Sequence, residues 1–287
     1  MEFEGLAEGC VTTILSHTTP VDACRLSLVS NLFRSAAYSD AVWERFLPAD
    51  YSSIISQCSL SNYPSKKALY LALSDRPVIF DNGRKSLQLE KKSGKKSLML
   101  SARALGIVWG ESEDYWSWTT HPDSSHHQLA DVSAFGILMH IPDFLYNSLF
   151  PEVVELEMVC WLEIRGVLNT LTLSPNTQYA AYFVFKTMDV RGFANSPVEL
   201  AVNFLGDHGS TKIVCLDPRV QSSRNNRVAG LQRPNIRSDG WLEIEMGEFF
   251  NTTLENEVEM SVTEAKGGNW KSGLVVEGIE LRPKYEN

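Results

Sequence analysis

The periodicity of the apolar residues changes near residue 78, and this change constrains the fold more than any other feature of the sequence. Before residue 78, apolar side chains recur every three or four positions, which is typical of amphipathic helices. After it, short alternating runs are separated by Gly, Pro, Asn and Asp, which is typical of strands joined by turns. We therefore predict a small all-α region followed by an all-β antiparallel sandwich of the jelly-roll type.

Three short helices are expected at the start of the chain. The stretch TTPVDACRLSLVSNLFRSAA should form the second helix, because Thr19 can cap it, Pro20 suits its first turn and Asp22 complements the helix dipole. The third helix is expected over residues 39–47. The apolar side chains expected on the inner faces are Val11, Ile14, Leu15, Leu26, Val29, Leu32, Phe33, Ala36, Val42, Trp43, Phe46 and Leu47.

We divide the chain into a helical unit at 1–47, a helical linker at 48–77 and a sandwich at 78–287. A helical unit of about 45 residues buries too little surface to be stable alone, and no disulfide or metal spacing supports this one. The helices therefore either dock on the rest of the chain or complete their core against a partner protein.

Alternating runs predict the strands of the sandwich. The stretch SLQLEKKSGKKSLMLS indicates a hairpin, whose lysines suit a solvated turn better than a nucleic-acid or nuclear-localisation role. In WLEIRG, Leu162 and Ile164 should face one side of a strand, with Trp161, Glu163 and Arg165 on the other. Further strand candidates are YAAYFVFK, VELAVNF, KIVCL, WLEIEMG, EVEMSV and GLVVEGIEL.

Charge and cysteine content exclude several classes of function. The net charge of −9 argues against a general nucleic-acid or anionic-membrane binder, and no run of about 18 apolar residues is present. Five scattered cysteines without a CxxC pair indicate reduced thiols rather than a disulfide framework or a zinc site. The first residues lack the pattern of a secretory signal, so we expect a protein of the cytoplasm, the nucleus or both.

Residues 107–118, IVWGESEDYWSW, combine four aromatic rings with a short acidic loop. Trp109 and Trp116 flank the loop, so both can stand at one rim if one strand ends near Trp109 and another begins near Tyr115. The opposing interpretation is that these rings simply fill the sandwich core.

Residues 3–47 resemble an F-box, the helical motif that docks on the Skp-type adaptor of SCF ubiquitin ligases. The resemblance rests on the ILS end of the first helix, TPVDACRLSLVSNLFRSAA and SDAVWERFLP. It implies that the adaptor, and through it a cullin, is a partner, and that Leu6, Ile14, Leu15, Val29 and Trp43 contact the adaptor. The motif usually opens with Leu-Pro, whereas Leu6 is followed here by an alanine, which lacks the pre-set helical φ of proline.

The remainder, roughly 78–285, is similar to the phloem protein 2 or Nictaba-type plant lectin domain. The motifs that carry the similarity are MLSARALGIVWGESEDYWSW, CWLEIRG, YAAYFVFK, RSDGWLEIEMGEFF and NWKSGLVVEGIELRPK. The resemblance implies binding of N-acetylglucosamine-type glycans through Trp109, Trp116, Glu257 and Glu264, and we expect Trp118 to lie in the core.

The two glutamates differ in how well they suit a sugar site. In EVEMSV, alternation places Val258, Met260 and Val262 inside, so Glu257 should be exposed and able to accept from a sugar hydroxyl. The same alternation places Glu264 on the core side with Val262, unless it lies past the end of the strand.

No pattern in the sequence indicates catalysis, a cofactor or a metal. The histidines of HPDSSHH have no further ligands at metal spacing, and the nucleotide-binding and nucleophile-elbow fingerprints are absent. We expect a non-catalytic subunit whose sandwich selects substrates for ubiquitination, reading N-acetylglucosamine or N-acetyllactosamine-type glycans on glycoproteins. The alternative is an adaptor whose sandwich binds a protein target directly, because tryptophans are also enriched in protein hot spots.

Overall fold

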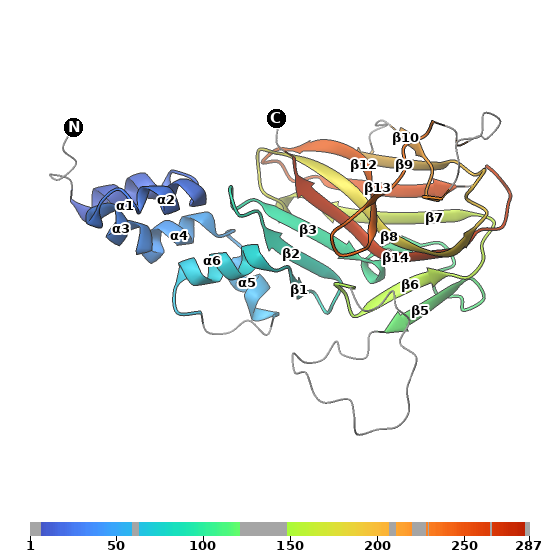
Figure 1. The fold of residues 1–287 in the computed structure, drawn as a ribbon, viewed down its shortest axis with the longest axis horizontal. Helices are drawn as coiled ribbons and strands as arrows, with labels where there is room; N and C mark the ends of the chain where they lie inside the picture. The colour runs from blue at the N-terminus through green and yellow to red at the C-terminus, as the bar shows by residue number, and fades with distance from the viewer. Residues whose placement is uncertain are drawn as a thin grey trace, which may run out of the picture.

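The computed structural model describes residues 7–58, 63–120, 148–206, 211–219, 228, 230–264 and 266–284. Helices gather at one end of the molecule and strands form the rest (Figure 1). A helical region followed by antiparallel sheets is the predicted fold class, and it is confirmed.

Six α-helices precede the strands in the described part of the chain. They are α1 (Glu8–Ser16), α2 (Pro20–Leu26), α3 (Asn31–Tyr38), α4 (Asp40–Phe46), α5 (Tyr51–Ser56) and α6 (Lys66–Asp75).

The prediction of a single second helix over TTPVDACRLSLVSNLFRSAA is wrong, because this stretch forms two helices, α2 and α3. Thr19 caps α2 as expected, its hydroxyl accepting a hydrogen bond from the Asp22 N–H at 3.1 Å. Ser30 provides a second cap, for α3, by accepting from the Phe33 N–H at 3.3 Å. This second capping serine ends the first helix early and leaves Leu28 and Val29 in the exposed connection between them.

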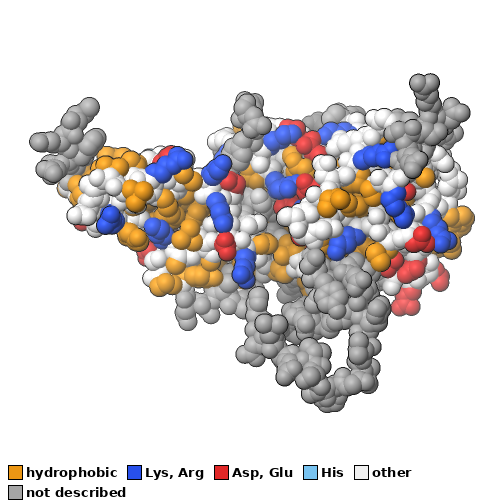
Figure 2. Space-filling model, in the orientation of Figure 1, with side chains coloured by type: hydrophobic (Ala, Val, Ile, Leu, Met, Phe, Trp, Pro, Cys, Tyr) orange, Lys and Arg blue, Asp and Glu red, His pale blue; other side chains and the backbone are white. Residues whose placement is uncertain are grey.

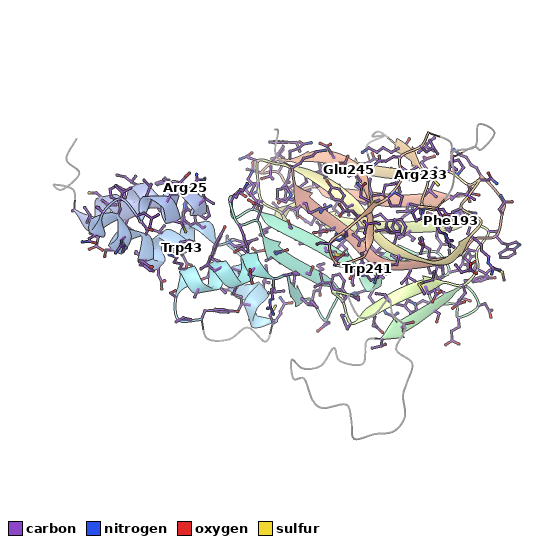
Figure 3. All side chains as sticks on the ribbon, viewed as in Figure 1. Arg25, Trp43, Phe193, Arg233, Trp241 and Glu245 are labelled. Carbon is purple, nitrogen blue, oxygen red and sulfur yellow. The ribbon has the colours of Figure 1, made fainter. Side chains whose placement is uncertain are left out.

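The helices close their core against the rest of the chain. Buried side chains of α1, α3 and α4 pack with those of α6 and with Val78, Leu87 and Leu89 from the first strands. Trp43 lies in this cluster, between the helices (Figure 3). Of the two alternatives for the small helical unit, docking on the rest of the chain is therefore what the fold adopts.

The strands form two antiparallel sheets. The first has the order β1 (Val78–Phe80), β2 (Lys85–Leu89), β3 (Lys96–Ser101), β14 (Ser272–Pro283), β8 (Thr177–Arg191), β12 (Leu242–Asn251) and β11 (Asn235–Ile236), with β5 (Trp116–Thr120) and β6 (Glu152–Leu156) joining through β14. The second has the order β10 (Thr211–Val214), β9 (Val198–Phe204), β13 (Glu257–Glu264), β7 (Leu162–Asn169) and β4 (Gly106–Ile107).

The main core lies between the inner faces of the two sheets. Alternation decides which side chains enter it: Leu162, Ile164 and Leu168 of β7 are buried in the core, whereas Arg165 and Val167 are exposed. The two faces predicted for WLEIRG are thus confirmed.

The loops at the end of the sandwich remote from the helices carry the features of greatest functional interest. Segments 108–115, 157–161 and 266–271 all lie there (Figure 1). Backbone hydrogen bonds join neighbouring segments: Glu157 N–H to Tyr115 O at 2.9 Å, and Val159 N–H to Lys271 O at 3.0 Å. We call this end of the sandwich the distal end.

Candidate binding surfaces

The helical end presents an apolar surface around the connection between α2 and α3. Leu28 is 78% exposed, Val29 is 66% exposed, and Ile14 of α1 is about half exposed. Hydrophobic side chains also gather over the helices in the space-filling view (Figure 2). Exposed aliphatic residues in this number are typical of a surface that another protein covers.

Two of the residues predicted to contact an adaptor are instead inside the helical core. Leu15 is fully buried, and Trp43 is buried with its indole N–H donating to the Ala37 carbonyl at 2.7 Å. Direct contact is therefore a wrong prediction for these two, because the helix faces that carry them turn into the helical core, Leu15 of α1 toward α3 and α4 and Trp43 of α4 toward α6. Ile14 and Val29 are exposed as such a contact requires, and Leu6 lies outside the described residues.

A groove of about 600 Å³ runs beside this surface. Its walls come from Val21 of α2, from Leu28 of the α2–α3 connection and from Leu71 of α6. The groove therefore continues the apolar surface beyond the first 47 residues onto the linker helix.

At the distal end, Trp109 occupies the tip of a tight turn between β4 and β5. Its φ is +63°, a left-handed conformation that is unusual for a bulky residue. The turn is closed by the Gly110 N–H, which donates to the Ile107 carbonyl at 3.0 Å. The Trp109 ring is 61% exposed and lies 5.9 Å from the Tyr115 ring. A strained, exposed aromatic residue is a feature that accumulates at binding sites.

Trp116 and Trp118 support this turn from below. The Trp116 indole N–H donates to the Val108 carbonyl at 3.1 Å, and that of Trp118 donates to the Gly110 carbonyl at 2.8 Å. Trp116 is only 1% exposed, so the prediction that its ring stacks on a sugar at a rim is wrong. Trp118, expected in the core, is half-buried beneath the Arg103 guanidinium, which lies 3.5 Å from its ring centroid.

The two predicted glutamates lie at opposite ends of β13. Glu257 is exposed, as predicted, and pairs with Asn169 at the end of the sandwich that faces the helices. Glu264 ends β13 opposite Leu162, next to the distal end. Seven strand positions separate them, which is about 24 Å. Glu257 therefore cannot share a small-ligand site with Trp109, and the four predicted sugar-binding residues do not converge.

Glu264 is inside the protein, on the core side that alternation predicted. Its carboxylate is paired with the Lys271 ammonium, and both side chains are almost completely buried. Direct acceptance of a sugar hydroxyl by Glu264 is therefore contradicted, because its oxygen atoms are covered by the protein.

The distal end gathers exposed apolar side chains that the sequence reasoning missed. Besides Trp109, these are Met158, Trp161 at 51% exposure and Trp270 at 56% exposure, each on one of the three hydrogen-bonded segments. The available signal was a tryptophan one or two residues before a strand, in CWLEIRG and in NWKSG. The arrangement provides flat aromatic surfaces of the kind that stack on the apolar face of a sugar ring.

Exposed carboxylates lie on two of the segments that carry these rings. Glu111, Glu113, Asp114 and Glu157 are all exposed, and none of them forms an ion pair within the described ranges. Burial, together with the charge of Glu157, raises the pKa of Glu155 nearby. The distal end thus combines apolar rings with an acidic rim that can accept hydrogen bonds.

Metal and membrane sites are not found where the chain is described. No group of three or more His, Cys, Asp or Glu side chains lies close enough to hold a metal ion in that part, and the histidines of residues 121–127 fall outside it. Among the helices described, none is long and apolar enough to cross a membrane.

Comparison with known proteins adds two domain assignments. The model of the phloem protein 2 family matches residues 95–141 and 137–283, and the F-box domain model matches residues 4–45. The F-box protein PP2-B10 of Arabidopsis thaliana is 43% identical over 285 residues, covering 98% of this chain and 94% of that protein. The F-box protein PP2-B15 of the same plant is 39% identical over 303 residues, covering 97% and 96%.

Among solved structures, the C-terminal CBM6 of the marine laminarinase LamC from Zobellia galactanivorans is 9% identical, with a TM-score of 0.28. The match covers 64% of this chain and 98% of that chain. A TM-score this low carries no argument about the ligand of the present chain.

Proposed function

The chain belongs to the family of F-box proteins with a phloem protein 2 domain, and from this premise we propose that it is a substrate-recognition subunit of an SCF-type ubiquitin ligase. The F-box implies binding of a Skp-type adaptor. In this proposal the helical end docks on the adaptor, which joins it to a cullin, while the sandwich holds the target. The chemistry of ubiquitin transfer belongs to other subunits, and the protein works in the cytoplasm, the nucleus or both.

The adaptor half of the proposal is supported by the apolar surface at the helical end. Leu28 and Val29 are exposed although they are surrounded by well-packed helices, and exposed aliphatic side chains gain free energy when a partner covers them. The neighbouring groove between α2 and α6 offers further apolar surface for the same partner.

The adaptor half can be tested with single substitutions that keep the helical core intact. Leu28→Asp and Val29→Asp should each weaken capture of the protein by a Skp-type subunit about tenfold or more, because burying an unpaired carboxylate is costly. Leu254→Asp is the matched control, since Leu254 is equally exposed but lies on the sandwich. Undiminished capture by both helical variants would contradict the assignment.

The sandwich half of the proposal is recognition of N-acetylglucosamine or N-acetyllactosamine-type glycans on target glycoproteins. The observation that supports it is the distal end, where exposed tryptophans stand beside exposed carboxylates. Rings can stack on the C–H face of a sugar while carboxylates accept from its hydroxyl groups.

The glycan half is tested by calorimetric titration with chitin oligomers and N-acetyllactosamine. The wild-type protein should bind, and Trp109→Ala should lose about tenfold or more in affinity, while Phe250→Ala, an exposed aromatic of β12, should not.

A second candidate function is direct binding of a protein target by the same end of the sandwich. The observation that favours it is Met158, a flexible side chain that is common on protein-binding surfaces and is exposed beside the tryptophans. If the wild-type protein binds none of the glycans tested, this alternative is favoured over the lectin function.

A further inference from the structure

A buried ion pair lies directly beneath the distal end. The Lys271 ammonium contacts the Glu264 carboxylate and donates to the Cys160 carbonyl at 3.0 Å and the Asn269 carbonyl at 2.8 Å. The ammonium thus lies between one carboxylate and two backbone carbonyls. The Lys271 side chain is 0% exposed and that of Glu264 is 2% exposed.

The pair joins three segments that are far apart in the sequence. Glu264 ends β13 and also accepts a hydrogen bond from the Gly267 N–H at 2.7 Å. Lys271 exchanges two backbone hydrogen bonds with Val159, at 2.7 and 3.0 Å. The end of a strand and the loops 157–161 and 266–271 therefore meet at one buried charge pair.

Two glycines allow these loops to approach so closely. A Cβ at Gly267 would lie 2.8 Å from the Glu264 carboxylate, and one at Gly192 would lie 2.1 Å from the Trp270 carbonyl. The next residue, Phe193, is buried in the core near this end (Figure 3). The backbone that carries Trp270 is therefore packed against Gly192 and is also hydrogen-bonded, through Lys271, to Val159.

The exposed rings of the distal end stand on the segments that the pair joins. Trp161 directly follows Cys160, and Trp270 lies between Asn269 and Lys271. Both carbonyls that accept from the Lys271 ammonium thus belong to residues adjacent to an exposed tryptophan. Any change at the pair should move these rings.

We infer that Glu264 is a positioning residue that acts through Lys271 to set the rings of Trp161 and Trp270, which together with Trp109 form the ligand-contact surface. This inference rests on the proposed function and assigns contact residues to it. Glu264 does not touch the ligand, because its carboxylate is enclosed by Lys271 and Gly267. Buried ion pairs contribute little net stability, and in some proteins they fix one geometry, which is the role inferred for this pair.

Substitution of the pair separates positioning from direct contact. Glu264→Met or Lys271→Met leaves one buried charge without its partner, and each should lower the affinity for chitotriose about tenfold or more. The double variant leaves no buried charge, but it also lacks the ammonium that holds the Cys160 and Asn269 carbonyls, so its affinity should stay as low as that of Lys271→Met. Glu248→Met, which removes a carboxylate from the half-exposed pair with Lys284, is the matched control and should leave binding unchanged.

A direct role of Glu264 predicts a different pattern. In that case Glu264→Met and the double variant would both lose binding, whereas Lys271→Met alone would retain it, and the inference would be overturned. Undiminished binding by both single variants of the ion pair would also overturn the inference. So would undiminished binding by the two variants Trp161→Ala and Trp270→Ala.

A second measurement does not depend on any glycan. The indole N–H signals of Trp161 and Trp270 in an NMR spectrum should shift in each single variant and stay shifted in the double variant, because the Lys271 hydrogen bonds to Cys160 and Asn269 are lost there too. If the wild-type protein binds no glycan, the lectin half of the proposed function fails, and these signals still decide the positioning role. If single variants do not fold, Glu264→Gln and the double variant decide it, and failure of these to fold would contradict a role confined to the loops.

Discussion

At the scale of the residue, the same local motif occurs twice, and its first side chain is exposed in one copy and buried in the other. Trp161 and Trp241 each begin a WLEI motif, yet Trp161 is exposed at the distal end and Trp241 is completely buried. Trp241 lies on the outer face of the first sheet, where it packs with Phe150 and with the Lys186 ammonium 4.5 Å from its ring centroid (Figure 3). Local sequence places both rings on the face opposite the main core, and only the distant segments that cover one of them distinguish the two.

Backbone strain at Trp109 leads to a prediction at this scale. Because φ is +63°, Gly is more favourable there than Ala by about 1 kcal/mol. Trp109→Gly should therefore have a higher free energy of unfolding than Trp109→Ala, although both should lose glycan affinity. Denaturant unfolding of the two variants measures this difference, and equal or reversed stabilities would show that the turn is not strained.

A buried carboxylate should make stability depend on pH. Burial raises the pKa of Glu277 to about 7, against the opposing effects of the Leu149 N–H, the Arg237 charge and the Ser148 hydroxyl, while Asp239 adds to the rise. Since the folded-state pKa lies above the ordinary value, the stabilisation is complete below about pH 4.5 and is lost as pH rises through 7.

We expect Glu277→Gln to remove this pH dependence. Between pH 5 and pH 8 the wild-type protein should lose up to about 3 kcal/mol relative to the variant in free energy of unfolding. Urea unfolding of both proteins at the two pH values provides the measurement. Parallel behaviour of the two would contradict the buried, protonated state of Glu277.

At the scale of the element, the helical unit and the sandwich share a core. Tyr70 of α6 donates to the Glu90 carbonyl at 3.1 Å, and the Lys96 ammonium contacts Asp50 at 2.8 Å and the Thr172 carbonyl at 2.9 Å. These contacts join α5 and α6 to the β2–β3 hairpin and to the turn after β7. The helical end is thus part of one packed body with the sandwich.

Removal of the helices should therefore damage the sandwich. A chain that begins at residue 78 exposes Val78, Leu87 and Leu89, which are buried in the intact protein, and we expect it to aggregate and to bind an apolar dye. Leu87→Thr and Leu89→Thr in the shortened chain should reduce aggregation, because threonine suits a strand without an apolar side chain. A shortened chain as soluble and stable as the full protein would contradict the shared core.

At the scale of the whole molecule, the surfaces that we propose for the adaptor and for the ligand lie at opposite ends (Figure 1). β14 alone has twelve residues and extends from the distal end toward the helices, a length of about 40 Å. Because the helices and the sandwich share a core, this separation is held by the fold rather than by a flexible linker. In the proposed assembly, a target bound at the distal end would thus be presented at a set distance from the adaptor.

Charge at this scale predicts selectivity among glycans. The chain carries a net charge of −9, and the distal end has an exposed acidic rim. Uncharged N-acetyllactosamine should therefore bind more tightly than its sialylated or sulfated forms, with a difference that shrinks as salt is added. Glu113→Lys should narrow the difference in a calorimetric titration, and equal affinity for neutral and anionic glycans in wild type would contradict the role of the rim.

Local patterns in the sequence determined the class of fold, and they also determined several helix caps and the buried faces of the strands. Capping by Thr19, the change of periodicity near residue 78 and the alternation that places Ile164 inside and Glu257 outside all depend on neighbours within a few positions. These interactions are short-ranged, so the residues themselves reveal them.

The tertiary structure alone decided which of the candidate residues form a site. It buried Trp116 in the main core and joined the segments that carry Trp109, Trp161 and Trp270 at the distal end. The meeting of Trp109, Trp161 and Trp270 depends on segments more than forty residues apart, which come together at one end of the sandwich. Burial and proximity are set by such long-range packing, which no local pattern in the sequence encodes.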